Sequence, residues 1–156
     1  MIEIKQEFKD LIPPLTKEEF KQLENNCMTE GIREKILTWN GFIIDGHNRY
    51  EIATRWDLDF ETENKHFDNE EAVKEWMILN QFGRRNLSNY QRSVLALELE
   101  DVFKGKAKDN LIKGGKVSQE GLQISAKAID TRKELSKVAN VSHDTIAKVK
   151  KIQAQA

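Results

Sequence analysis

The stretch from Phe42 to Tyr50, with the sequence FIIDGHNRY, combines residue types that suit phosphate chemistry. Its apolar beginning predicts a strand, its glycine predicts a tight turn, and the apolar spacing that starts at Tyr50 predicts a helix. A helix that begins at such a turn directs its free backbone N–H groups and the positive end of its dipole toward the turn. Arg49 adds a cation in the first helical turn. The sequence therefore predicts a phosphate-binding turn around Gly46.

The phosphate-binding turn needs a hairpin before it and a helix after it. Asn40-Gly41 is the commonest signal for a tight hairpin turn, and it separates two predicted strands at 32–39 and 42–44. The helix after the turn is predicted from about Arg49 to Arg55, and a polar strand is predicted over residues 59–66. Two paired strands and one helix would therefore position the turn.

The residues before the hairpin predict a short strand at residues 2–4 and one helix. Two consecutive prolines at 13–14 interrupt any regular element, and Thr16 with Glu19 predicts a capping box that starts a helix. Cys27 falls on the apolar face of that helix and Gly31 ends it, so we expect a small core cysteine rather than a nucleophile. A single cysteine in the chain cannot form an internal disulfide.

Helical patterns occupy the rest of the chain. Apolar spacing predicts a helix from Asn69 to about Gly83 and a longer helix that is capped near Ser88. Residues 105–121 are rich in lysine and glycine. That composition predicts either a flexible connection or a helix of modest stability.

The segment from Thr131 to Ile152 fits a helix-turn-helix, two helices joined by a short turn. Asn140 occupies the turn position that requires a left-handed backbone, Val141 fills the gap between the helices, and Ser142 caps the second helix. Apolar residues at helical spacing predict the inward faces, namely Leu135, Val138 and Ala139 on the first helix and Ile146, Val149 and Ile152 on the second. The alternative is a plain helical hairpin with a solvated basic face.

A helix-turn-helix places the N-terminal end of its second helix in the major groove of DNA. The predicted DNA contacts are then the polar residues left facing outward, with the lysines serving mainly the phosphates: Lys133, Ser142, His143, Asp144, Thr145, Lys148 and Lys151. Because such proteins commonly bind two half-sites, a homodimer is expected.

Charge divides the chain in two. Residues 1–80 carry 18 Asp and Glu against 10 Lys and Arg, a net charge of −8, whereas residues 81–156 carry 8 against 15, a net charge of +7. We therefore expect double-stranded DNA to bind the C-terminal half. No apolar run approaches the roughly 20 residues of a membrane helix, and the first ten residues lack the apolar core of a signal peptide. A cytoplasmic, nucleoid-associated protein without a membrane partner is expected.

Together, the turn and the C-terminal helices resemble the ParB-like family of bacterial plasmid and chromosome partition proteins, whose N-terminal domain shares a fold with sulfiredoxin. The resemblance extends from about Leu11 to Ile152. It implies a glycine-rich opening at 31–36, a first phosphate motif at 46–50 and a second at 80–84. It also implies a bound nucleotide, CTP or ATP with Mg²⁺, held by Gly31, Gly46, His47, Asn48, Arg49, Tyr50, Asn80, Gln81 and Arg84.

The chain departs from the family pattern in both phosphate motifs. His47-Asn48 stands where the family usually has Glu-Arg, and Asn80-Gln81 stands where it usually has Glu-Asn. Because Mg²⁺ prefers oxygen donors, we assign no metal-ligating residue. The catalytic cysteine of sulfiredoxin is also missing, since a histidine follows Gly46.

The turn also suggests an alternative function. The DGHNR sequence at 45–49 is similar to that of relatives on this fold that phosphorylate free serine, which implies an NTPase or a small-molecule kinase. The candidate catalytic residues are then Asp45, His47 and Glu34, with Glu30 as the alternative glutamate. A carboxylate can accept the proton of a hydroxyl nucleophile while Arg49 holds the phosphates. A third hypothesis makes the front domain a protein-interaction module.

The expected architecture is α+β in two domains. Residues 1–85 are expected to form a ParB-like nucleotide-binding or phosphate-binding domain with a small mixed sheet and helices. Residues 86–156 are expected to form an all-helical DNA-binding domain, with the helix-turn-helix at about 131–152. The expected function is DNA binding in the partition, maintenance or regulation of a plasmid, phage, mobile element or chromosome, gated by a nucleotide.

Overall fold

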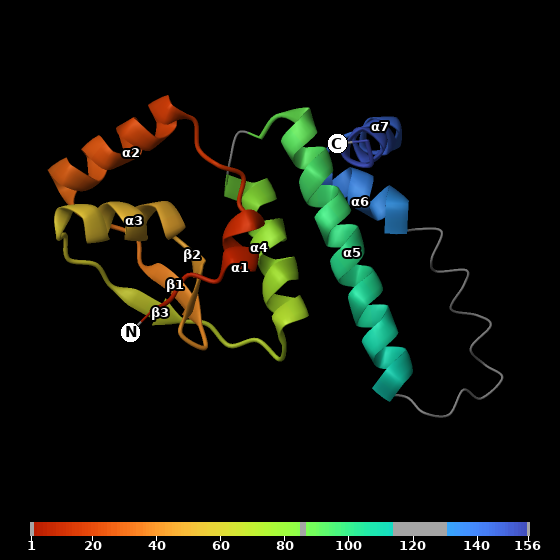
Figure 1. Cartoon of the computed structure of the whole chain (residues 1–156), viewed down its shortest axis with the longest axis horizontal. Helices are drawn as coiled ribbons and strands as arrows, with labels where there is room; N and C mark the ends of the chain where they lie inside the picture. Colours follow the sequence, from red (N-terminus) through yellow and green to blue (C-terminus); the bar gives the residue numbers. More distant parts are fainter. Residues whose placement is uncertain (1, 85–86, 114–130, 156) are drawn as a thin grey trace. The chain divides into compact units, whose positions relative to one another are not determined.

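The computed structural model describes residues 2–84, 87–113 and 131–155 (Figure 1). The chain forms two compact units, Met1–Val73 and Lys74–Ala156. Helix α4 (Glu70–Arg84) begins in the first unit and continues in the second. The functional boundary that the sequence suggests near residue 85 stays a prediction.

The first unit is built on a three-stranded mixed sheet of order β2-β1-β3. Strand β1 (Ile36–Trp39) pairs antiparallel with β2 (Phe42–Asp45) and parallel with β3 (Thr62–Asn64). The hairpin turn between β1 and β2 has left-handed backbone at both Asn40 (φ 48°) and Gly41 (φ 86°). Two-residue hairpin turns of this kind match the twist of the flanking strands. The predicted Asn-Gly hairpin, the mixed sheet and the α+β fold class are confirmed.

The strands are shorter than the sequence suggests. β1 starts at Ile36 rather than at residue 32, and β3 covers three of the residues predicted at 59–66. Leu37 is already paired with the last residue of β2, so the described sheet offers no β2 partner to residues 32–35. Residues 2–4 form an isolated bridge between Glu3 and Phe42 instead of a strand.

Three helices complete the first unit. The short helix α1 (Gln6–Asp10) was not predicted, because the following prolines suggested irregular structure. Helix α2 (Lys17–Glu30) starts at the predicted capping box, in which the Glu19 N–H donates to Thr16 Oγ1 and the Thr16 N–H donates to Glu19 Oε2. Helix α3 (His47–Trp56) contacts β1 on one side and α2 on another, and it lies between them in Figure 1.

The core of the first unit lies around the hairpin and α3. Phe8, Ile36, Ile43, Ile44 and Ile52 are all exposed by 1% or less. Burying such side chains contributes roughly 1.5–3 kcal/mol each relative to leaving them in water. This packing fixes the end of β2 and the start of α3, between which the predicted phosphate-binding turn lies. The predicted burial of Cys27 is also confirmed.

The described part of the second unit is helical. The long helix α5 (Asn89–Lys113) packs against α6 (Thr131–Ala139) and α7 (His143–Gln153). Its predicted cap is present, since the Gln91 N–H donates to Ser88 Oγ and the Ser88 N–H donates to Gln91 Oε1. Of the stretch predicted at 105–121, residues up to Lys113 are helical, and 114–121 lie outside the described residues.

A small apolar cluster holds α6 and α7 on α5. Ala96, Ala139 and Val141 are buried together, and Phe82 and Ile146 pack against them. Arg92 adds a polar link, because its Nη1 donates to the carbonyl oxygen of Ala139 at 3.3 Å. A guanidinium is well suited to the unpaired carbonyls at a helix C-terminus. The turn that follows α6 is therefore anchored to α5.

Candidate functional site

The turn between β2 and α3 depends on one glycine. Gly46 is the N-cap of α3 and has a left-handed backbone (φ 93°, ψ 19°), and no side chain caps the helix there. The first N–H groups of a helix have no partners within the helix, so they remain available to an anion. The Tyr50 N–H donates to the Gly46 carbonyl at 2.8 Å and begins the helical hydrogen-bond pattern. The structure therefore has the strand, glycine turn and helix that a phosphate-binding turn requires.

Replacing Gly46 with alanine should destabilise the protein by about 1–2 kcal/mol, because an L-residue at positive φ is strained. A Cβ there would also lie 3.2 Å from Arg49 Nη2 and 3.4 Å from Ile36 Cγ1. The matched control is Gly83→Ala in helix α4, where a Cβ meets no atom within 4 Å and where alanine favours the helix. Urea unfolding should show a loss for Gly46→Ala and no loss for Gly83→Ala. Equal midpoints for the wild type and Gly46→Ala would contradict the assigned turn.

Arg49 lies between two carboxylates. Its Nη1 is 2.9 Å from Glu34 Oε2, and its Nη2 is 3.4 Å from Asp45 Oδ2. The Arg49 side chain is only 18% exposed, and its Nε has no hydrogen-bond partner among the described residues. The predicted phosphate-binding arginine is therefore held in place by acidic neighbours.

Arg49 lines a cavity of about 420 Å³ at the C-terminal end of α2. This cavity, here called the arginine cavity, is lined by Leu23, Asn26, Cys27, Gly31, Arg33, Glu34 and Arg49. Burial raises the pKa of the Cys27 thiol, which fits a core residue rather than a nucleophile. The structure thus brings together three of the residues singled out from the sequence: Gly31, Glu34 and Arg49.

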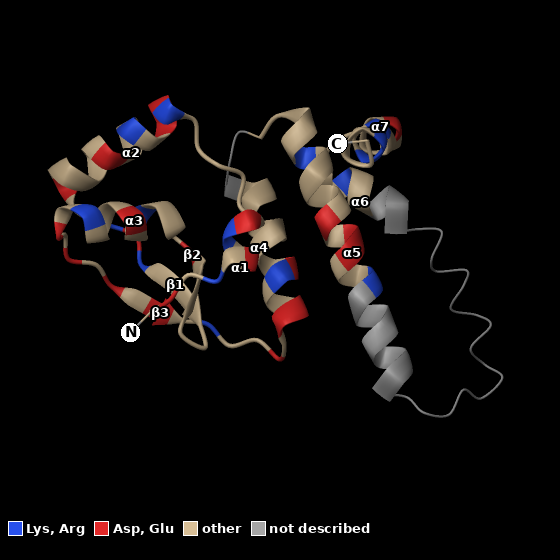
Figure 2. Cartoon of the chain, in the orientation of Figure 1, with Lys and Arg blue, Asp and Glu red and all other residues tan. Residues whose placement is uncertain are grey.

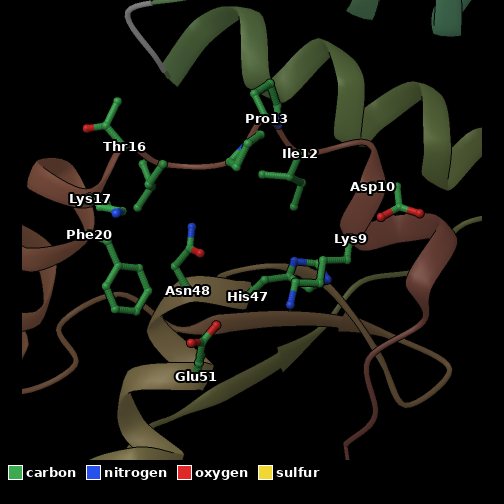
Figure 3. Close-up of a pocket in the computed structure, with 12 residues that line it drawn as sticks. Lys9, Asp10, Ile12, Pro13, Thr16, Lys17, Phe20, His47, Asn48 and Glu51 are labelled. Carbon is green, nitrogen blue, oxygen red and sulfur yellow. The ribbon is translucent and has the colours of Figure 1, made fainter. Parts of the chain in front are cut away.

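His47 and Asn48 line a different cavity, of about 630 Å³, shown in Figure 3. This histidine cavity lies between the first turn of α3, the end of α1, and the loop and first turn that open α2. His47 is 5% exposed, and neither of its ring nitrogens has a hydrogen-bond partner among the described residues. Burial lowers the pKa of His47 to about 4; Asp45 raises it in part, and Lys9 lowers it further. The imidazole is therefore neutral at pH 7.

The buried imidazole should make stability depend on pH. An unfolded histidine has a pKa near 6.5, so between about pH 6.5 and pH 4 the unfolded chain binds a proton that the folded chain does not. Stability contributed by His47 is therefore complete above pH 6.5 and falls by up to about 3 kcal/mol as the pH drops to 4. Urea unfolding at pH 7, 6, 5 and 4 measures this slope. In the variant His47→Gln the slope should be clearly smaller, and an unchanged slope would contradict the buried neutral histidine.

Sequence reasoning missed most of the walls of the histidine cavity. These are Lys9, Asp10, Ile12, Pro13, Pro14, Leu15, Thr16, Lys17, Phe20 and Glu51. The available signals were the two prolines and the capping box at Thr16, which fix where the chain turns before α2. Nothing in the sequence shows that this loop lies over the start of α3. Figure 3 shows it there.

The remaining predicted residues of the first motif have structural partners. The ring of Tyr50 contacts the ring of Phe60 edge-on, with 5.6 Å between the ring centroids. Asp45 bonds to Arg49 and does not cap α3. The candidate catalytic set is divided, because Glu34 lines the arginine cavity and His47 lines the histidine cavity. No observation therefore favours the kinase hypothesis.

The second predicted motif lies on α4, in the second unit. Gln81 is 4% exposed and its Oε1 has no hydrogen-bond partner among the described residues; the same holds for the buried Nδ2 of Asn80. Unpaired buried amides are costly, and they are found where water or a ligand completes the bonding. Arg84 is the last residue of α4, and its side chain lies outside the described part.

The turn between α6 and α7 has the predicted geometry. Asn140 has left-handed backbone (φ 52°), Val141 is 9% exposed, and Ser142 Oγ accepts from the Thr145 N–H as the N-cap of α7. Leu135 and Val149 are buried as predicted. The inward placement of Val138 and Ile152 is wrong, because they are 42% and 55% exposed. Val138 is rotated away from the stripe through Leu135 and Ala139, and Ile152 lies in the last turn of α7.

Most of the predicted DNA contacts form an exposed surface on α7. His143, Asp144, Lys148 and Lys151 are exposed, as is the cap residue Ser142. Figure 2 shows basic and acidic residues along α7. Thr145 is half-buried, and its hydroxyl lies 2.9 Å from Ser142 Oγ. Lys133 lies on α6, but its side chain is outside the described part. The second helix therefore presents two candidate lysines, Lys148 and Lys151, to solvent, while the hydroxyls of Ser142 and Thr145 lie at its cap.

The described residues contain no group of three His, Cys, Asp or Glu side chains placed to hold a metal ion. Over the same part of the chain, no helix has the length and apolar character to cross a membrane.

Comparison with known proteins gave matches only among solved structures. No protein-family model matches this chain, and no curated protein matches it. Solved structures do match, and the two described next match over almost the whole chain.

Two of these structures are Pnob8-like ParB N-domains. One has a TM-score of 0.64 at 16% sequence identity and is matched over 95% of this chain and 64% of its own length. The other has a TM-score of 0.61 at 17% identity, over 95% of this chain and 59% of its own. The protein therefore has the fold of a ParB N-domain, and it spans about three fifths of the length of these structures.

Proposed function

We propose that the protein is a ParB-like DNA-binding protein that acts in the partition, maintenance or regulation of a plasmid, phage, mobile element or chromosome. Its fold matches that of ParB N-domains over 95% of the chain. The observation that carries the DNA-binding part is the turn from α6 to α7, in which Asn140 is left-handed and Ser142 caps the exposed second helix. This arrangement supports a helix-turn-helix with α7 as its recognition helix.

The charges of α7 suit the phosphate backbone of DNA. The helix carries Lys148, Lys150 and Lys151 against a single acidic residue, Asp144. All three lysines are exposed, and Lys150 Nζ also lies 3.7 Å from Glu100 Oε1 on α5. Exposed lysines attract phosphates from a distance and give affinity that falls with salt. The N-terminal end of α7, with His143 and Asp144, would meet base edges.

The same proposal includes a nucleotide that gates DNA binding, with CTP and ATP as the candidates. Arg49, together with the free N–H groups at the start of α3, offers its phosphates a cation and hydrogen-bond donors. Mg²⁺ fits the protein groups poorly, because the first motif supplies a neutral histidine and an amide at positions 47–48. We therefore propose that Arg49 and backbone N–H groups bind the nucleotide.

A homodimer is the proposed assembly, because helix-turn-helix proteins commonly bind two half-sites. Binding to chromosomal DNA would place the protein on the nucleoid.

Selection from a pool of random duplexes tests the proposed function. The full chain is incubated with the pool at about 50 mM salt, where phosphate contacts are strong, and bound duplexes are sequenced over several rounds. The proposal predicts retention of duplex DNA and enrichment of a shared sequence, with half-sites if the protein is a dimer. No retention of duplex at this salt concentration would contradict it.

A further inference from the structure

The two carboxylates that bind Arg49 differ in how firmly they are held. Asp45 lies at the end of β2 and its side chain is 13% exposed. Glu34 lies in the loop between Gly31 and β1, and its side chain is 67% exposed. Asp45 is therefore a fixed partner of Arg49, whereas Glu34 can swing into solvent without uncovering any core residue.

Glu34 binds the guanidinium nitrogen of Arg49 that a phosphate would need. Its Oε2 is 2.9 Å from Arg49 Nη1, the shorter of the two ion pairs, and both residues line the arginine cavity. Because Glu34 is 67% exposed, water and salt screen its charge, and the ion pair contributes little. A phosphate that brings more negative charge to the same guanidinium can therefore displace Glu34.

Arg49 would stay in place when Glu34 leaves. Its side chain is 18% exposed, its Nη2 still binds Asp45, and it lies beside the turn glycine, where a Cβ would be 3.2 Å from Nη2. With Glu34 bound, Arg49 faces two carboxylates, and the net charge of the three side chains is −1. Once Glu34 is displaced, the net charge is zero. Arg33, which pairs with Glu30 at 2.7 Å, also lines the cavity.

We propose that Glu34 is a built-in competitor for the anion site of Arg49. Its carboxylate pairs with the guanidinium when no ligand is present. The arginine cavity therefore favours ligands with several phosphate charges, such as a nucleoside triphosphate, over singly charged anions. The proposal deepens the nucleotide site of the proposed function and rests on it. Glu34 sets the affinity threshold and does not hold the ligand.

Calorimetric titration of the full chain with inorganic tripolyphosphate tests this role. The variant Glu34→Gln keeps the size of the side chain and removes its charge, and it should bind tripolyphosphate about three- to tenfold more tightly than the wild type. The matched control is Glu61→Gln, which removes a charge that is 76% exposed against 67% for Glu34. Glu61 pairs with Lys35 at 3.1 Å and does not line the arginine cavity. Glu61→Gln should bind like the wild type.

Each outcome separates the hypotheses. A gain in Glu34→Gln alone supports the competitor role. Equal gains in Glu34→Gln and Glu61→Gln would reveal a general charge effect and overturn it, as would weaker binding by Glu34→Gln. If the wild type binds tripolyphosphate and Glu34→Gln binds it equally well, the competitor role fails and the nucleotide site survives. If no variant binds tripolyphosphate, CTP or ATP, both fail.

Discussion

Replacing Lys148 and Lys151 together with alanine should weaken binding to duplex DNA by about ten- to a hundredfold at low salt. Both lysines are exposed on α7, the proposed recognition helix. The slope of log affinity against log salt should also decrease by about 2, because two phosphate contacts are lost. Alanine favours helices, so α7 should stay folded. Fluorescence anisotropy with a labelled duplex at several salt concentrations measures both effects.

A matched control removes the same charge from the first unit. Lys17 and Lys21 are exposed on α2, so replacing both with alanine gives a protein of the same net charge as the α7 variant. If DNA contacts α7, the control should bind nearly as tightly as the wild type. Equal losses in the two variants would mean that the affinity for DNA depends only on the net charge of the protein, and the assignment of α7 as the DNA-binding helix would be wrong.

Replacing Arg49 with alanine should lower the affinity for CTP or ATP by about ten- to a hundredfold, the usual contribution of a charge-assisted arginine–phosphate contact. Asp45 and Glu34 would then lack their cation, and Glu34, which lines the cavity, would repel the phosphates. Calorimetric titration of the full chain with each nucleotide, with and without Mg²⁺, measures the loss.

Arg55 supplies the control for that experiment. It lies on the same helix, is 48% exposed and pairs with Glu24 and Glu51. It lines neither the arginine cavity nor the histidine cavity. Arg55→Ala should therefore bind nucleotide like the wild type. Unchanged binding by Arg49→Ala would remove this arginine from the nucleotide site.

Positions where the backbone demands one residue type could be predicted from the sequence. The left-handed residues Asn40, Gly46 and Asn140 mark the hairpin, the phosphate-binding turn and the turn before α7, and the structure has each turn at its predicted place. Local rules suffice here, because the hydrogen bonds and dihedral angles involve neighbours in the chain. The caps at Thr16 and Ser142 were predictable for the same reason.

The direction of side chains at the candidate site could not be predicted. His47, Asn48 and Arg49 are consecutive, and the sequence treats them as one phosphate motif. Successive helical residues point about 100° apart, so the structure directs the first two into the histidine cavity and Arg49 into the arginine cavity. Which surface each residue meets depends on the loop before α2 and the loop after it, and these contacts are distant in sequence.

Binding of DNA through α7 is the central claim, and amide chemical shifts test it most directly. A ¹⁵N-labelled full chain is titrated with a short duplex at low salt while the backbone signals are followed. The largest shifts are expected from Ser142 to Thr145 and at Lys148, with little change in residues 2–73. Shifts confined to the first unit, or an α7 whose signals stay in place when duplex is bound, would contradict the claim.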